Sequence, residues 1–312
     1  MQSGQVLVAK TKKNQHYVAR AYLRAWSEEE RIYCLREGKL FRPNLTGVAC
    51  ERYFYRLQDL TPEEVRLIEK GFIERTSEPL RTLQKNFLSL HLAGPRLRKE
   101  VPNNADPTFL STLERIIAEG YEDFHQKIED SLLVFLRKML AGETDFYSDA
   151  RQAAEFLYDL CVQFTRTKQV REAAVAQIGA EFRGCDVRRM MGALSHVLAM
   201  SFGQSLYADR DKFKLLLVDN NTRTPFITAD QPIINLQGIH TGKPPEKLEF
   251  FYPLSPTRAM FLLEASSKRG EFALSDVSVN SYNMTMIQNS FEQVFSDSQE
   301  YLDSIKGVVR RT

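Results

Sequence analysis

The stretch TFLSTLERIIAEGYEDFHQKIEDSLLVFLRKML, residues 108–140, decides the fold of this chain. Apolar residues recur along it at intervals of three and four, namely Leu110, Leu113, Ile116, Ile117, Phe124, Ile128, Leu132, Phe135, Leu136 and Leu140. This period matches one face of an α-helix, and the run is longer than most helices of globular proteins. We therefore predict a long amphipathic helix over 108–140, at the centre of a helical core.

Further helices are predicted on both sides of this stretch. Thr61-Pro62-Glu63-Glu64 is typical of a helix start, because it offers a cap, a Pro in the first turn and acids near the positive end of the dipole. This helix is predicted to run to Phe87, with Pro79 kinking or dividing it. A charged, Pro-rich linker follows over 94–107. Two more helices are predicted over about 148–178 and 186–207.

The two flanks of the helical region have a mixed character. An apolar stripe over 14–26 predicts a short amphipathic helix, and 31–41 predicts a β-hairpin that turns at Gly38. Beyond the helices, we predict strands over 213–218, 225–228 and 258–263, with a Gly- and Pro-containing loop over 238–245. Helices over 278–289 and 298–306 are predicted to enclose a short strand over 293–295.

The predicted fold class is mainly α with a smaller β part (α+β), in which a core of long helices carries an N-terminal hairpin and a C-terminal antiparallel sheet. We predict one domain over 1–312 with three sub-regions: helix plus hairpin over 14–60, a helical core over 61–210, and a mixed β/α segment over 211–312. A chain of 312 residues is long enough to bury a sizeable core.

The composition excludes several classes of protein. A hydrophobic content of 43% is too high for a disordered chain, and a net charge of +2 does not by itself indicate nucleic acid or an anionic membrane as a partner. Residues 10–13, KTKK, form a candidate local basic patch. The four cysteines form no Cys-x-x-Cys pair, so we expect reduced thiols. Without a signal peptide or an apolar run of about 20 residues, we expect a cytoplasmic protein with no membrane partner.

The first candidate site is Asn14-Gln15-His16, just before the predicted helix over 14–26. Asn14 and Gln15 are candidate substrate-binding residues, and in the ordinary structural interpretation one of them caps that helix. A His near a helix N-terminus has its charged form disfavoured, which suits His16 as a neutral base or ligand. Arg20, one turn further on, and Arg24 are candidate ligands for phosphate or carboxylate groups of a substrate.

A second candidate site consists of acidic residues that could bind a metal ion. Glu74 and Glu78 are spaced to share one helical face, and carboxylates of this kind bind divalent cations such as Mg²⁺ or Mn²⁺. The more common interpretation of such residues is a solvated helix face with lysines and arginines nearby.

Gln163-Phe164-Thr165-Arg166-Thr167 places an arginine inside a helix that is otherwise rich in apolar residues. If Arg166 is buried, it needs an anionic partner. That partner is either internal, with Asp230 as one candidate, or a phosphate group of a ligand. Gln163 is included as a candidate substrate-binding residue.

The best functional candidate from local chemistry is Thr228-Ala229-Asp230-Gln231-Pro232. A β-type run ends there in an Asp, and Pro then forces the chain out of regular structure. Asp230 is therefore a candidate catalytic residue or metal ligand, and Thr228 a candidate substrate-binding residue. In the alternative interpretation, the Asp caps its own turn.

Several known motifs are absent. The chain has no Gly-rich phosphate loop, no Gly-x-Ser-x-Gly and no His-Glu-x-x-His. The spacing from Arg189 to His196 matches an RNase motif of some helical toxins, but Met190 follows the Arg where that motif has a polar residue.

The order of six segments resembles a known family. These are NQHYV (14–18), YLRAW (22–26), ERYFY (51–55), RT (166–167), FITADQP (226–232) and YPLSP (252–256). They look like the mostly bacterial family of domains of unknown function numbered four-two-three-eight, whose members open with Gln-His-Tyr-Val-Pro and later carry Thr-Ser-Asp-x-Pro. Ala19, Trp26 and Ala229 depart mildly from that pattern. The resemblance implies no activity, but it implies that His16, Arg166 and Asp230 belong to one pattern.

Two main hypotheses follow for the function, and a third, a metal-independent enzyme that acts on a nucleotide or a modified tRNA, is not separated by the sequence from the first of them. In the first, the chain is an intracellular hydrolase of phosphodiesterase or nuclease type, such as a toxin or an anti-phage defence effector. His16, Arg166 and Asp230 are then catalytic, with nucleic acid as substrate and a divalent metal as cofactor. In the second, the chain is a non-catalytic binding or scaffold protein, with a protein partner or a second copy. The same residues then form a buried polar network.

Overall fold

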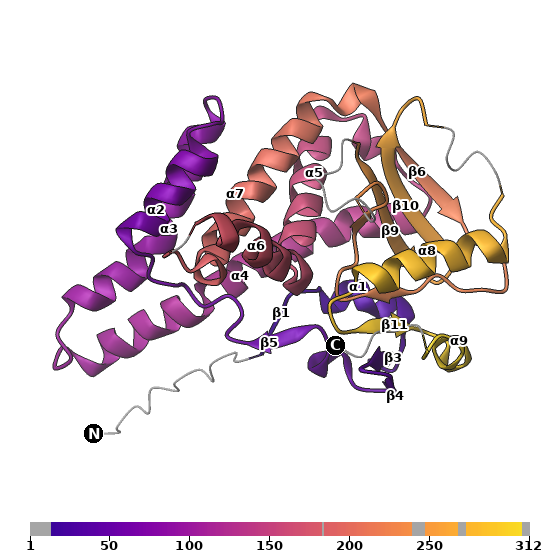
Figure 1. The fold of residues 1–312 in the computed structure, drawn as a ribbon, viewed down its shortest axis with the longest axis horizontal. Helices are drawn as coiled ribbons and strands as arrows, with labels where there is room; N and C mark the ends of the chain where they lie inside the picture. Colours follow the sequence, from indigo (N-terminus) through magenta and orange to yellow (C-terminus); the bar gives the residue numbers. More distant parts are fainter. Residues whose placement is uncertain (1–13, 183, 239–246, 268–272, 308–312) are drawn as a thin grey trace, which may run out of the picture.

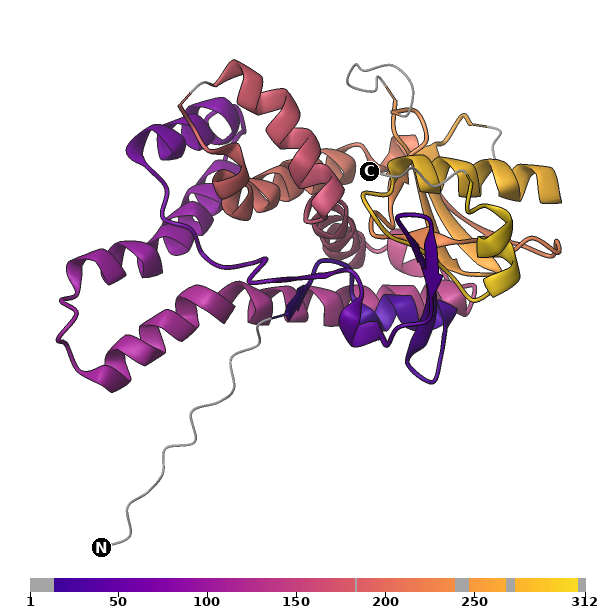
Figure 2. The same cartoon turned by 60° about the horizontal axis from the view of Figure 1, so that its bottom comes forward.

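A computed structural model describes residues 14–307, apart from residue 183 and the segments 239–246 and 268–272 (Figure 1). The predicted basic patch over 10–13 lies outside the described residues, as does the predicted loop over 238–245 except for Gly238. Figure 2 shows that two long helices form an arm on one side of the molecule, while the strands gather on the other.

Helix α4 (Pro107–Leu140) is the central helix that the apolar period predicted. Asp106 begins it by accepting a hydrogen bond from the backbone N–H of Phe109, and Pro107 occupies the first turn. Its inner face is buried, and α5 (Ala150–Thr165) and α7 (Val187–Ala208) pack in the same helical core. The predictions of long helices over 108–140 and 186–207 are confirmed.

The helix predicted from Thr61 is divided, as Pro79 suggested. It consists of α2 (Pro62–Ile68), a π-helical turn over Glu69–Ile73, and α3 (Leu80–Glu100). The linker predicted over 94–107 was wrong in its first half, because α3 continues through Gly94 and Pro95. A Cβ atom on Gly94 would lie 3.2 Å from Cγ1 of Ile117, so α3 and α4 are in close contact there. We attribute the persistence of the helix to this packing.

The single helix predicted over 148–178 is two helices. The first, α5, ends at Thr165, and the second, α6 (Lys168–Glu181), begins after two intervening residues. Thr167 is the N-cap of α6, because its hydroxyl accepts a hydrogen bond from the backbone N–H of Val170. The break positions Arg166 at the end of α5, as described below.

The helix predicted over 14–26 was wrong at its start. Strand β1 (Asn14–His16) pairs with β5 (Cys50–Arg52), and helix appears only in α1 (Arg20–Leu23) and a 3₁₀ turn over Arg24–Trp26. Gln15 and Tyr17 are both fully buried, and positions i and i+2 share a side only in an extended chain.

The predicted hairpin is confirmed as β3 (Arg31–Arg36) and β4 (Lys39–Phe41), with Arg36 opposite Lys39. Both turn residues, Glu37 and Gly38, have positive φ angles of 51° and 70°, as a two-residue type I′ turn requires. Strand β3 also pairs with β2 (Ser27–Glu28) and with β11 (Val294–Ser296), which in turn pairs with β7 (Thr228–Ala229). One sheet therefore joins the two flanks of the chain.

A second, antiparallel sheet has the strand order β6-β10-β9-β8. Its strands are β6 (Phe213–Asp219), β8 (Ile234–Asn235), β9 (Glu249–Ser255) and β10 (Arg258–Glu264). The strands predicted over 213–218 and 258–263 are confirmed. Of the strand predicted over 225–228, only Thr228 lies in a strand, namely β7 of the first sheet. Strand β9 was not predicted.

Both faces of this sheet are covered, which explains the continuous apolar runs of β9 and β10. Phe250 and Tyr252 belong to the same core as the long helices, whereas Phe251 stacks on Tyr282 of α8 (Asp276–Asn289) at 5.0 Å between ring centroids. Helix α9 (Gln299–Ser304) follows β11. The fold class is thus confirmed as α+β with a helical core. Among the described residues, none of the helices is both long and apolar enough to cross a membrane.

Candidate functional site

Arg166 lies where α5 ends, with its side chain only 2% exposed. Its guanidinium pairs with the carboxylate of Glu129 on α4 at 2.8 Å, and it donates to Oε1 of Gln163 at 2.7 Å. The sequence left open whether the partner of Arg166 is internal or a ligand. The structure gives an internal partner, and that partner is Glu129 rather than Asp230.

Two histidines extend this cluster. Nη1 of Arg166 lies 3.4 Å from Nδ1 of His125, and Nε2 of His125 lies 3.3 Å from Nε2 of His196 on α7. A guanidinium only donates, so Nδ1 of His125 accepts and its proton sits on Nε2. Nε2 of His196 then accepts in turn, which assigns the proton of that ring to Nδ1. We call Arg166, Glu129, Gln163, His125 and His196 the Arg166 network.

The rings of the Arg166 network are held as neutral imidazoles. Burial lowers the pKa of His125 well below its usual value, and it lowers the pKa of His196 to about 3. Aromatic contacts fix their positions, since the ring centroids of His125 and Tyr55 are 3.9 Å apart. A charged guanidinium and two neutral rings therefore share one interior site.

The N-terminal strand is tied to the helices by carboxamides. Gln15 donates to the carbonyl of Ala118 at 2.8 Å and accepts from the backbone N–H of Tyr55 at 2.6 Å. Gln163 donates to the carbonyl of Tyr17 at 3.3 Å. Gln15 and Gln163, which the sequence suggested as substrate-binding residues, are thus buried, Gln15 bonded to backbone groups and Gln163 to the backbone of Tyr17 and the side chain of Arg166.

Asp230 lies in a separate interior position and is 0% exposed. Its Oδ1 accepts the backbone N–H of Phe291 at 2.8 Å, and its Oδ2 accepts those of Glu292 at 2.8 Å and Gln293 at 3.0 Å. Burial raises its pKa to about 7, although the three N–H groups favour the carboxylate. Asp230 thereby joins β7 to the turn that leads into β11.

Thr228 and His16 also contact groups of the chain. The hydroxyl of Tyr22 donates to the carbonyl of Pro253 at 2.8 Å, so the hydroxyl of Thr228, 2.7 Å away, donates to Tyr22. Half-buried His16 lies on β1 with Nε2 3.3 Å from the carbonyl of Leu45. Burial and then Arg20 lower its pKa to about 4. The neutral form was expected, but the expected cause was wrong, because His16 does not begin a helix.

The remaining candidates lie on the surface. Asn14 and Arg20 are exposed, and Arg24 pairs with Glu30 at 2.6 Å. Glu74 follows the π-helical turn and Glu78 precedes α3, so the two acids do not share a continuous helix as expected. Within the described part of the chain, no group of three or more histidines, cysteines, aspartates or glutamates is placed to hold a metal ion.

Sequence reasoning missed Glu129, His125 and His196, which contact Arg166 directly or through one another. His125 and Glu129 are four residues apart on the predicted central helix, so they face the same way. That spacing was the available signal. His196 comes from another helix, and no local pattern links it to Arg166.

Fold and site together define the class of this molecule: an α+β protein in which the polar residues of its motifs are largely buried and paired with one another or with backbone. The chain belongs to the family described as "Protein of unknown function (DUF4238)", whose sequence model matches residues 14–300. The resemblance seen in the six ordered segments is confirmed. No curated protein and no solved structure matches the chain.

Asp230→Asn tests the interior role of that carboxylate. An amide keeps one acceptor oxygen and turns an N–H₂ group toward backbone N–H donors, so at least one donor loses its partner. We expect the free energy of unfolding to fall by about 1–3 kcal/mol, measured by urea denaturation. Asp145→Asn, at an exposed position where the side chain bonds to no other described residue, is the matched control and should leave stability unchanged. Equal stability of the two variants would contradict the assignment.

Proposed function

We propose that this protein is a non-catalytic binding or scaffold protein. The observation that carries the proposal is the burial of Arg166, whose guanidinium forms an ion pair with the carboxylate of Glu129 inside the molecule. A transition-state clamp needs a guanidinium that a substrate can reach. Asp230 likewise directs both carboxylate oxygens at backbone N–H groups.

The proposal is supported by the separation of the motif residues. Arg166 bonds to groups of α4 and α5, Asp230 bonds to the turn before β11, and His16 contacts the loop that carries Leu45. Each joins a different pair of segments that are distant in the sequence. Most polar atoms of these residues are paired inside the chain, although Nε of Arg166 and Nδ1 of His196 are buried without a hydrogen-bond partner among the described residues. Contacts of this kind specify how the flanks pack on the helices, and they require no catalytic chemistry.

The phosphodiesterase hypothesis is the competing prediction, and a cleavage assay separates the two. Under our proposal, the purified chain with Mg²⁺ or Mn²⁺ leaves single- and double-stranded RNA and DNA intact. Its background is the same as that of His16→Ala and Asp230→Asn. Cleavage by the wild type that both substitutions abolish, with folding intact by circular dichroism, would overturn the proposal. It would support a nuclease, with a toxin or defence role to be tested next.

A further inference from the structure

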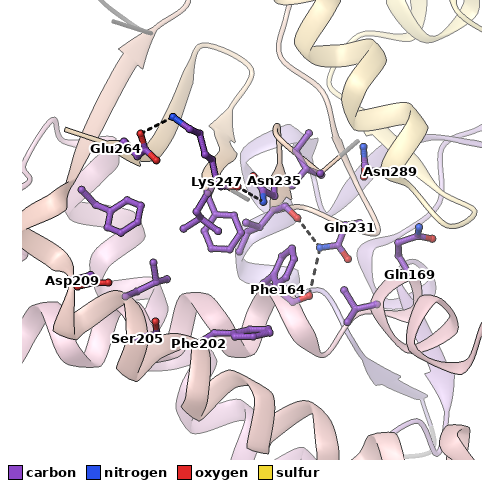
Figure 3. Close-up of a pocket in the computed structure, with 18 of the residues that line it drawn as sticks. Phe164, Gln169, Phe202, Ser205, Asp209, Gln231, Asn235, Lys247, Glu264 and Asn289 are labelled. Atoms are coloured by element: carbon purple, nitrogen blue, oxygen red, sulfur yellow. Dashed lines mark hydrogen bonds and ion pairs between the residues drawn. The ribbon is translucent and has the colours of Figure 1, made fainter. Parts of the chain in front are cut away.

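A pocket of about 750 Å³ lies between the helices α6 and α7 and the sheet β6-β10-β9-β8 (Figure 3). Its volume is in the range of sites for small organic ligands, which is about 300–1,000 Å³. Helix ends, strands and loops from the second half of the chain line it. None of the residues of the Arg166 network is among the lining residues, although Phe164, a neighbour of Gln163 in the sequence, is one.

Aromatic rings form the floor of the pocket. Phe164 at the end of α5 and Phe202 on α7 both line it, as Figure 3 shows. Phe202 is 43% exposed, which is unusual for a ring of that size and places an apolar face in the open part of the pocket. The ring of Phe250 packs against the ring of Phe164, with ring centroids 5.0 Å apart. These rings provide a surface on which a planar ligand can stack.

Carboxamides line one side of the pocket. Gln169 and Gln177 project from α6, eight residues apart, and their side chains form no hydrogen bond with any described residue. Gln231 differs, because its amide already bonds to Thr167, Phe164 and Ile233. A free carboxamide offers one donor and one acceptor side by side, the pattern that recognises the edge of adenine.

The charges that line the pocket are already compensated. Lys247 pairs with Glu264 at 3.2 Å, and Asp209 pairs with Lys212 at 2.7 Å. Among the described lining residues, no cation is left for a phosphate or carboxylate group of a ligand. The lining therefore favours a neutral ligand over a nucleotide.

We propose that this pocket binds a neutral purine ring of the adenine type, stacked on Phe202 and hydrogen-bonded at its edge by Gln169. The inference rests on the proposed binding function and names the ligand class. Base-on-aromatic stacking contributes affinity for any planar base, and the two-point amide contact supplies the discrimination between ligands.

Isothermal calorimetry with adenosine, N6,N6-dimethyladenosine and adenosine monophosphate tests the proposal. We expect saturable 1:1 binding of adenosine, weaker binding of N6,N6-dimethyladenosine because its six-amino group has no N–H to donate to the carboxamide oxygen, and no gain from the added phosphate. Phe202→Ala and Gln169→Ala should each weaken adenosine binding about tenfold or more. Leu90→Ala, at an exposed position on α3, is the matched control and should bind as the wild type does.

Two outcomes would overturn the inference. One is the absence of saturable adenosine binding to a chain that circular dichroism shows to be folded. The other is monophosphate binding at least tenfold tighter than adenosine binding, which would mean that the pocket recognises an anion. Neither outcome bears on the non-catalytic function, which the cleavage assay tests separately.

Discussion

Replacing Arg166 by Met should lower the free energy of unfolding by about 3–5 kcal/mol, the largest effect that we expect from a single substitution. Met fills a similar volume, so the loss is electrostatic rather than steric. The carboxylate of Glu129, only 16% exposed, would be left without its cation, and Oε1 of Gln163 would lose its donor. Urea denaturation followed by far-ultraviolet circular dichroism measures the change.

A double substitution separates a buried charge from a general packing defect. Arg166→Met combined with Glu129→Leu removes both charges, so most of the lost stability should return. Arg188→Met is the surface control, since the pair of Arg188 with Glu172 is exposed and such pairs contribute little. The account fails if Arg166→Met costs no more than Arg188→Met, or if the double variant is less stable than the single one.

Acidification should destabilise the protein steeply. Burial lowers the pKa of four histidines: His16 and His91 to about 4, His196 to about 3, and His125 well below its usual value. Each is neutral in the folded chain but takes a proton near pH 6.5 once unfolded. The stability that they contribute is therefore complete above pH 6.5 and is lost as the pH falls toward 4.

Two aspartates oppose this trend. Burial raises the pKa of Asp159 and of Asp230 to about 7, so the folded chain keeps protons there that the unfolded chain releases near pH 4. The two effects nearly cancel close to pH 7, and below about pH 6 the unfolded chain binds between one and two more protons in all. The free energy of unfolding should thus fall by on the order of 2 kcal/mol per pH unit between about pH 6 and 4.5.

Urea titrations at pH 7, 6 and 5 measure this slope. His91→Phe removes one histidine and should make the slope shallower, whereas Asp230→Asn removes an opposing carboxyl and should make it steeper. Because the two substitutions should change the slope in opposite directions, they distinguish titration of His91 and Asp230 from a general effect of acid. Stability that is constant or that rises between pH 6.5 and 5 would contradict the account.

The sequence predicted the parts of the fold that local patterns control. The apolar period of 108–140, the start at Thr61 and the turn at Gly38 each depend on residues close together in the chain, and each is confirmed. The predictions over 14–26 and 148–178 were wrong where distant contacts decide. Pairing with β5 holds residues 14–16 extended. Thr167, which caps α6 locally, is also held by a hydrogen bond from its hydroxyl to the distant Gln231, and the helix divides there.

The same distinction applies to the candidate site. Arg166 and Asp230 could be singled out because a buried charge stands out in an apolar run, and both are buried. Their partners could not be assigned, because Glu129 and the backbone of 291–293 are brought to them only by tertiary packing. The sequence offered no reason to prefer Glu129 over Asp230 as the partner of Arg166.

The sheet in which β3 pairs with β11 has a consequence for synthesis on the ribosome. Residues 31–36 emerge more than 250 residues before 294–296, the segment that supplies their hydrogen-bond partners on one side. Throughout that interval the nascent chain carries a hairpin with an open edge, the kind of edge on which chains pair wrongly. Closing a loop of this length late in translation is slow relative to forming helices, so the helical region should be in place first. Shielding of that hairpin by a chaperone would therefore matter most before the last strands have been made.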